Sequence, residues 1–261
     1  MKLLFIGDIV GKPGRRAVAR LLPGLIGRHE IDLVIANCEN AAGGFGVTRD
    51  VVEELYRNRI DVLTSGNHIW DKKDVKDYME DYRTLLRPAN YPDGLPGWGS
   101  VLANNNSGSS VGVVNVEGRV FMKPLDCPFK TAEKEAADLR TKTNIIIVDL
   151  HAEATSEKEA LGWYLDGKVS ALVGTHTHVQ TADERVLPKG TAYITDVGMT
   201  GSLDSVLGVR KEIAIERFLT LTPNKFEVAK GNVWLQAVVI DVDDRSGKST
   251  SIERVNEKLV M

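Results

Sequence analysis

The residues best suited to chemistry in this sequence are imidazoles, carboxylates and amides that follow short apolar runs. His176 and His178 come after the run that ends at Gly174, and in extended backbone two such side chains point the same way, about 7 Å apart at Cα. For this pair alone, two solvated loop histidines are an adequate interpretation. Side chains of the same kinds, however, follow other apolar runs along the chain: Asp8, Glu39, Asn40, Asn67, His68 and His151. That recurrence favours a shared metal site with oxygen and imidazole nitrogen ligands.

The elements that must position these residues are buried strands. Continuous apolar runs of strand length are typical of strands covered on both faces of a parallel sheet. Such runs occupy residues 2–6, 32–36, 61–65, 111–116, 144–149, 171–173 and 191–195. Helical spacing lies between them at residues 15–22, 49–59 with Thr48 as N-cap, 131–143, and in a helix opened by a capping box at 156–159. This alternation predicts βαβ units in an α/β fold, with the polar residues gathered at the carboxyl edge of the sheet.

Other stretches depart from that alternation. Residues 11–14 contain two glycines and a proline, which predicts a turn, and Pro23 is expected to end the helix that follows. Residues 87–112 carry several prolines and the polar tract Asn104–Ser110, which predicts an excursion or a hairpin loop. Residues 233–255 alternate, turn and alternate again, which predicts an antiparallel hairpin near the end of the chain.

Composition restricts the class of protein. Hydrophobic residues make up 43% and charged residues 26% of the 261 residues, as in ordinary globular proteins. The net charge of −3 implies no basic face for long nucleic acid, although a small anionic ligand needs only local charge. Cys38 and Cys127 offer neither a disulfide framework nor paired metal spacing, and strand alternation points Cys38 away from Glu39 into the core.

The sequence also indicates the number of domains and the cellular location to expect. No repeat or linker divides the sequence, so we expect a single domain over residues 1–261. No apolar stretch approaches the roughly 18 residues that a membrane-spanning helix needs. No leader-like segment precedes the first strand, and we therefore expect a cytoplasmic protein with no membrane partner.

The polar segments together resemble the motifs of the calcineurin-like metallophosphoesterases: an initial GD, a second carboxylate loop, GNH, a lone histidine and a terminal HxH. Here these stand as Gly7-Asp8, Glu39-Asn40, Gly66-Asn67-His68, His151 and His176-Thr177-His178. More closely, the stretches NCENAAGGFGVT, SGNHIWD, GTHTHVQTADE and TDVGMTG are similar to the YmdB family of that superfamily, over residues 1 to about 255. The resemblance implies a four-layer α/β/β/α sandwich and action on 2′,3′-cyclic nucleotides.

The resemblance also implies a ligand set. The superfamily's first motif is usually D-x-H, whereas Asp8-Ile9-Val10 has no histidine, and Glu39 stands where an aspartate usually bridges. Both changes are expected in the YmdB-like group. One metal would then be held by Asp8, Glu39, Asn40 and His178, and the other by Glu39, Asn67, His151 and His176. The two ions are divalent or of mixed valence, with iron favoured and manganese or zinc as alternatives.

The expected reaction is in-line displacement at phosphorus, in which two metals clamp the attacking and leaving oxygens and a hydroxide held by them attacks. His68 is adjacent to the expected ligand Asn67 but belongs to neither ligand set, so we expect it to protonate the leaving ribose oxygen. Which ester bond breaks stays open. Two rival hypotheses are a regulatory or partner-docking protein whose metal site senses a phosphorylated ligand with little turnover, and a phosphoesterase for another substrate class.

Several neighbouring residues have two interpretations. Phe45 and Trp70 can stack on a nucleobase or simply pack at the rim of the sheet. The glycines at 43, 44 and 46 can let backbone approach a phosphate or can make a tight turn. Residues 196–201 are either an ordinary glycine turn or a contact with substrate or a second subunit. We expect a homo-oligomer.

Overall fold

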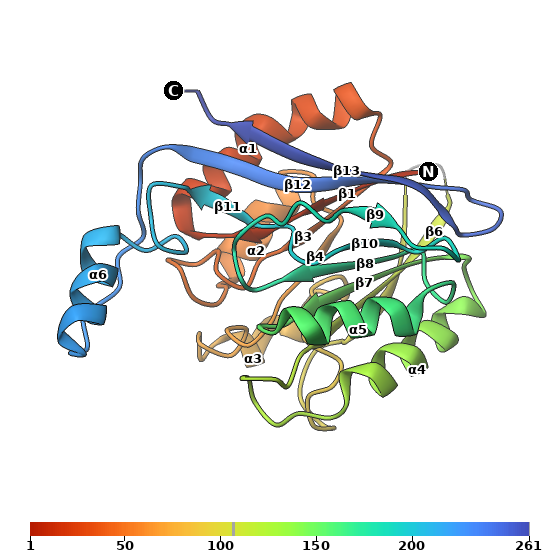
Figure 1. Cartoon of the computed structure of the whole chain (residues 1–261), viewed down its shortest axis with the longest axis horizontal. Helices are drawn as coiled ribbons and strands as arrows, with labels where there is room; N and C mark the ends of the chain where they lie inside the picture. The colour runs from red at the N-terminus through yellow and green to blue at the C-terminus, as the bar shows by residue number, and fades with distance from the viewer. Residues whose placement is uncertain (106–107, 261) are drawn as a thin grey trace.

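The computed structural model describes residues 1–105 and 108–260, in which two β-sheets lie between layers of helices (Figure 1). The first sheet has the strand order β2-β11-β12-β1-β3-β4, with β13 also paired to β12. Its strands are β1 (Lys2–Ile6), β2 (Asp8–Ile9), β3 (Leu33–Asn37), β4 (Val62–Thr64), β11 (Met199–Ser202), β12 (Val233–Val242) and β13 (Ser249–Lys258). Strands β1, β3 and β4 are parallel, while β12 and β13 form the predicted antiparallel hairpin.

The second sheet has the strand order β5-β6-β7-β8-β10-β9. Its strands are β5 (Ser100–Asn104), β6 (Ser110–Glu117), β7 (Ile145–His151), β8 (Ala171–Thr175), β9 (Arg185–Val186) and β10 (Ala192–Ile194). The four central strands are parallel, and β5 and β9 are antiparallel edges. Strands β5 and β6 confirm a hairpin within the proline-rich stretch, although part of its Asn104–Ser110 tract lies outside the described residues.

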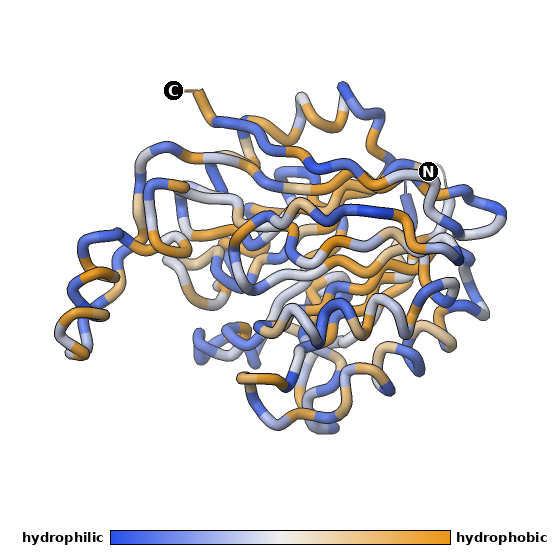
Figure 2. Tube along the Cα trace, viewed as in Figure 1, coloured by the Kyte–Doolittle hydropathy of each residue, from blue (hydrophilic) through white to orange (hydrophobic). Residues whose placement is uncertain are grey.

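Side-chain alternation explains why the strand sequences are apolar throughout. In β1, Leu3 and Phe5 face the layer between the sheets, whereas Leu4 and Ile6 face the helices on the outer side. In the second sheet, Ile147 of β7 faces the same central layer. The residues on either side of it, Ile146 and Val148, face the helices that cover the outer side of this sheet. Figure 2 shows hydrophobic residues concentrated along these central strands. The predicted four-layer α/β/β/α sandwich is confirmed.

Helices α1 (Gly11–His29) and α2 (Arg49–Arg57) cover the first sheet, and α4 (Pro128–Arg140) and α5 (Thr155–Leu165) cover the second. Short helices α3 (Val75–Tyr78) and η1 (Met79–Asp81) follow β4. Helix α6 (Lys211–Thr220) projects from the sandwich at the left of Figure 1, and of its residues only Ala214 is buried. No described helix is both long enough and apolar enough to cross a membrane.

Some predicted boundaries are wrong. Residues 11–14 form the first turn of α1 rather than a loop, because the first N–H groups of a helix lack partners and a proline there loses nothing. The helix also continues through Pro23, held by burial of Leu22 and Leu25. The capping box at residues 156–159 is not formed, because α5 begins at Thr155 with Ala154 as its N-cap, and no side chain caps this helix.

Candidate metal centre

The predicted ligand residues all lie at the carboxyl ends of parallel strands, where the two sheets meet. Asp8 follows β1, Glu39 and Asn40 follow β3, Asn67 and His68 follow β4, His151 ends β7, and His176 and His178 follow β8. Short contacts connect them across the gap between the sheets, so segments distant in sequence form one cluster. The structure therefore brings together all the predicted ligand residues and His68.

One half of the cluster centres on His151, which is fully buried. Its Nε2 lies 3.1 Å from Glu39 Oε1, 3.1 Å from Asn67 Oδ1 and 3.0 Å from His176 Nδ1. Ligand atoms of Glu39, His151 and His176 all lie within 4.8 Å of one another. Gly66 packs so closely on the His151 ring that a Cβ at this position would overlap it, which explains the glycine of the GNH segment.

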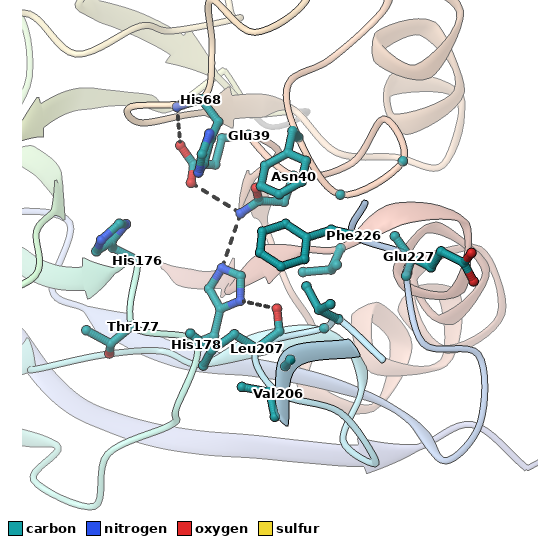
Figure 3. A pocket seen from close by; sticks show the side chains of 18 of the residues that line it. Glu39, Asn40, His68, His176, Thr177, His178, Val206, Leu207, Phe226 and Glu227 are labelled. Carbon is teal, nitrogen blue, oxygen red and sulfur yellow. Dashed lines mark hydrogen bonds between the residues drawn. The ribbon is translucent and has the colours of Figure 1, made fainter. Parts of the chain in front are cut away.

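The other half consists of Asp8, Asn40 and His178. The Asn40 amide nitrogen lies 3.2 Å from Glu39 Oε1 and 3.1 Å from His178 Nε2, and Figure 3 shows it between those two side chains. His178 Nε2 also lies 3.7 Å from Asp8 Oδ1. Asp8 is fully buried, and its Oδ1 has no hydrogen-bond partner among the described residues. A buried carboxylate oxygen without a partner is costly, and a cation is a fitting partner.

The charges of the cluster also suit a cation. Burial raises the pKa of Asp8 against the opposing effect of His178. Burial also acts to raise the pKa of Glu39, but the charge and hydrogen bond of His151 outweigh it and lower the value to about 2. For His151, burial is outweighed by Glu39, which raises the pKa to about 9, so the cluster retains a proton where no metal balances its carboxylates. Burial and His151 lower the pKa of His176 to about 3, which leaves a neutral imidazole able to coordinate.

A buried network below His151 orients its ring. The Thr175 hydroxyl donates to Asp149 Oδ1 at 2.7 Å and lies 2.9 Å from His151 Nδ1. Since that hydroxyl has one hydrogen, it accepts from His151 Nδ1–H, and this makes Nε2, once its proton is lost, the nitrogen that would face a metal in the cluster. Asn37 contributes an amide nitrogen 3.2 Å from the second oxygen of Asp149. Burial raises the pKa of Asp149 to about 6, with His151 acting against it.

The loop of His176 and His178 has an unusual backbone. Both residues have positive φ, 99° and 64°, a conformation that costs a non-glycine residue energy. Thr177 between them donates its N–H and its hydroxyl to Asp196 Oδ2, at 3.0 and 2.7 Å. The same oxygen accepts from Lys158 Nζ at 2.7 Å, and both members of this ion pair are fully buried.

His68 lies at the edge of the cluster. Its backbone N–H donates to Glu39 Oε2, while its Nδ1 lies 2.8 Å from Asp71 Oδ2 and its side chain is 29% exposed. The ring meets Phe45 edge-on, with centroids 5.0 Å apart. Its Nε2 makes no hydrogen bond to any described residue, so this nitrogen is available to a bound molecule.

A pocket of about 450 Å³ opens beside the cluster, within the size range of small-molecule sites. Glu39, Asn40 and the histidines form one end, and apolar residues form the other (Figure 3). Arg217 and Phe226 also line this pocket, and sequence reasoning missed both because their segment carries neither a strand pattern nor a ligand motif. Trp70 does not line it and instead packs edge-on against Tyr91.

The four-layer sandwich, with carboxylate, amide and imidazole groups at the meeting edge of its sheets, defines a metallophosphoesterase. Residues 4–255 match the model of a family described as YmdB-like protein. The chain belongs to that family, as its motifs predict.

Known proteins resemble this chain in sequence and structure over nearly its whole length. The chain is 51% identical over 255 residues to a 2′,3′-cyclic-nucleotide 2′-phosphodiesterase from Bacillus subtilis (strain 168), covering 98% of this chain and 96% of that protein. A crystal structure of a hypothetical protein from Thermus thermophilus is 43% identical, with a TM-score of 0.92 and 99% of each chain covered. A crystal structure of a phosphatase from Mycoplasma pneumoniae is 35% identical, also with a TM-score of 0.92, covering 99% of this chain and 93% of that one.

Proposed function

We propose that this chain is a metal-dependent phosphodiesterase that hydrolyses 2′,3′-cyclic nucleotides at the bond to the 2′ oxygen, leaving a nucleoside 3′-phosphate. The convergence of buried carboxylate, amide and imidazole groups on one pocket carries the proposal. The activity for which the Bacillus subtilis relative is named supports both the substrate class and the choice of bond.

The contacts of the cluster support the two ligand sets that the family resemblance implies. Asp8, Asn40 and His178 approach one another on one side of Glu39, and Asn67, His151 and His176 do so on the other. Glu39 touches both groups, so it is the residue that both ions would share. Two bound divalent ions would polarise the phosphate and supply a nucleophilic water at neutral pH.

His68 is the proton donor in this proposal. Asp71 holds Nδ1 of the ring, so Nε2 is the nitrogen that delivers a proton to the leaving 2′ oxygen. Phe45, against the edge of the ring, restricts its rotation. Because the backbone N–H of His68 donates to Glu39, the proton donor is positioned relative to the bridging ligand.

We also propose iron as the native metal, with manganese or zinc as the alternatives. A mixed set of carboxylate, amide and imidazole ligands accommodates each of these ions, so supply and geometry select among them. Elemental analysis of protein purified without chelators tests the identity directly. Iron below a tenth of the total bound metal would contradict this assignment without affecting the proposed reaction.

The decisive experiment pairs metal content with hydrolysis of 2′,3′-cyclic AMP before and after chelation. We expect about two metal ions per chain, turnover that chelation abolishes, and adenosine 3′-phosphate as product. The variant Glu39→Gln should lose metal and turnover together, whereas the matched variant Glu54→Gln, which only breaks an ion pair with Arg15, should keep both. Metal without turnover would favour the regulatory hypothesis, and preferential hydrolysis of a linear diester or monoester would indicate another substrate class.

Three further expectations accompany this function. We propose that the chain acts as one domain, that it is cytoplasmic, and that it forms a homo-oligomer. Apolar side chains of α6 and the residue after it are exposed and support the last of these: Ile215, Phe218, Leu219 and Leu221. Light scattering of the purified protein tests the assembly, and a monomeric mass at micromolar concentration would contradict it.

A further inference from the structure

The apolar end of the pocket has no role in the chemistry derived above. It is formed by segments that are distant in sequence: Phe45 from the loop after β3, Val206 and Leu207 from the loop after β11, and Phe226 and Val228 from the segment after α6. Figure 3 shows Phe226 beside Asn40 and His178, on the opposite side of the pocket from His176. An apolar wall therefore lies directly against the candidate metal centre.

Two glycines hold this wall in place. A Cβ at Gly11 or Gly44, both at positive φ, would meet the Val228 side chain at 3.0 to 3.2 Å. Val228 is thus seated against the glycines, and Phe226, two residues earlier, is brought to the pocket. The glycine-rich loop serves close approach of a distant segment, an interpretation that its sequence alone does not provide.

Planar groups form the wall. The rings of Phe45 and Phe226 lie 6.0 Å apart at their centroids with an angle of 30° between their planes, and the Arg217 guanidinium carbon lies 4.8 Å from the Phe226 centroid. Phe45 also contacts His68, so the wall touches the proposed proton donor directly. Aromatic rings with an arginine are the usual stacking surface for nucleobases.

The polar side chains of the pocket outside the cluster already have partners, with one exception. Glu153 pairs with His176, Glu227 pairs with Arg210 and points away from the pocket, and the Thr177 hydroxyl donates to Asp196. Arg217 makes no ion pair with any described residue. The wall therefore offers a stacking surface on which Arg217 is the described side chain with hydrogen-bond donors left for a ligand.

We propose that the wall formed by Phe45, Phe226 and Arg217 is a base-stacking subsite that makes this enzyme select cyclic nucleotides over base-free cyclic phosphates and purines over pyrimidines. The inference rests on the proposed function, because it deepens the substrate class of the same site. The purine preference follows from area: a two-ring base covers more of the wall than a one-ring base.

The test compares three substrates: 2′,3′-cyclic AMP, 2′,3′-cyclic CMP and the 2,3-cyclic phosphate of methyl riboside, which has no base. For Phe226→Ala we expect KM to rise about tenfold for the AMP substrate, less for the CMP substrate, and not at all for the base-free one, with kcat little changed. Phe226→Trp should restore the KM for the AMP substrate. The control Phe121→Ala, at a phenylalanine that is 90% exposed and outside the pocket, should change nothing.

Equilibrium binding of adenosine 3′-phosphate, measured by calorimetry on the metal-loaded protein, separates the two proposals. If Phe226→Ala weakens this binding while wild type hydrolyses no cyclic nucleotide, the subsite stands and the proposed reaction fails. If wild type hydrolyses cyclic nucleotides but Phe226→Ala changes all three KM values equally, or changes none, the subsite is overturned and the proposed reaction stands.

Discussion

Replacement of Asp196 by asparagine tests how the fold holds the loop of His176 and His178. The Asp196 carboxylate accepts hydrogen bonds from Lys158, from the Thr177 N–H and hydroxyl, and from the Gly198 N–H. All of these groups are hydrogen-bond donors. In asparagine one carboxylate oxygen becomes an NH₂ group, which would face at least one of these donors and lose that hydrogen bond. The Lys158 ammonium, fully buried, would lose its counter-charge.

The magnitude follows from that unpaired charge. Removing one member of a buried ion pair costs about 3–5 kcal/mol, compared with a total stability of about 5–15 kcal/mol for a domain, so the variant should fold with a much lower urea midpoint. The affinity for metal should fall about 10–100-fold, because Thr177 no longer fixes the two flanking histidines. Urea unfolding of the chelated protein and metal titration of the reconstituted protein measure the two effects separately.

The matched control is Asp183→Asn. Asp183 likewise accepts from a backbone N–H and a hydroxyl, both of Thr195, but it forms no ion pair with a buried ammonium among the described residues. It should lose about 1–2 kcal/mol and keep metal affinity. If Asp196→Asn is within about 1 kcal/mol of wild type and binds metal equally well, the argument for a buried ion pair that holds the loop is refuted.

Other predictions concern single contacts. His68→Ala should lower kcat about 10²–10⁴-fold with metal content unchanged, and equal loss of both by elemental analysis and kinetics would reject the role of proton donor. Thr175→Val should weaken metal binding about 10–100-fold in titrations, since His151 Nδ1 loses its acceptor, and unchanged affinity would contradict the tautomer argument. Burial raises the pKa of Glu117 above its ordinary 4.5, outweighing His151 and the Tyr91 hydroxyl, which act to lower it. The stability that its protonated form contributes is complete below pH 4.5 and is lost as the pH rises through the folded-state pKa. Glu117→Gln should therefore stabilise the chelated protein by about 1–3 kcal/mol at about pH 8 and by much less near about pH 4, and a gain independent of pH would show that titration is not the cause.

The layers and the positions of the proposed ligand residues could be predicted because local patterns encode them. A strand buried on both faces is mostly apolar, and the polar residues that directly follow it lie at the edge of the sheet, as Asp8 and Glu39 do. The placement of Cys38 in the core followed from the same alternation and is confirmed. The convergence of strand ends then required only that the strands be parallel.

The apolar wall and the buried ion pair could not be predicted, because both depend on contacts distant in sequence. Lys158 lies in a helix rich in charged residues and resembles a solvated lysine until its partner on the strand-end loop, Asp196, is known. Residues 199–202 read as a glycine turn, yet they form β11, which exists only because it pairs with β2 and β12. Helix α6 contains apolar residues, but almost all of them are exposed, so they do not mark a face that packs on a sheet.

The proposed ligand residues could be predicted from the sequence, whereas the residues that hold them in place could not, because the two groups lie in different parts of the fold. His176 and His178 have left-handed backbone, which the sequence HTH does not favour, and the conformation persists only because surrounding groups enforce it. That enforcement comes from Asp196 on one neighbouring segment and Lys158 on the helix packed against the sheet. Ligand identity is thus carried by residues at strand ends, whereas ligand geometry is carried by residues whose effect appears only after the sheets and helices have assembled. A homologue with intact ligands but without the Lys158–Asp196 pair should therefore fold to the same sandwich and bind metal poorly.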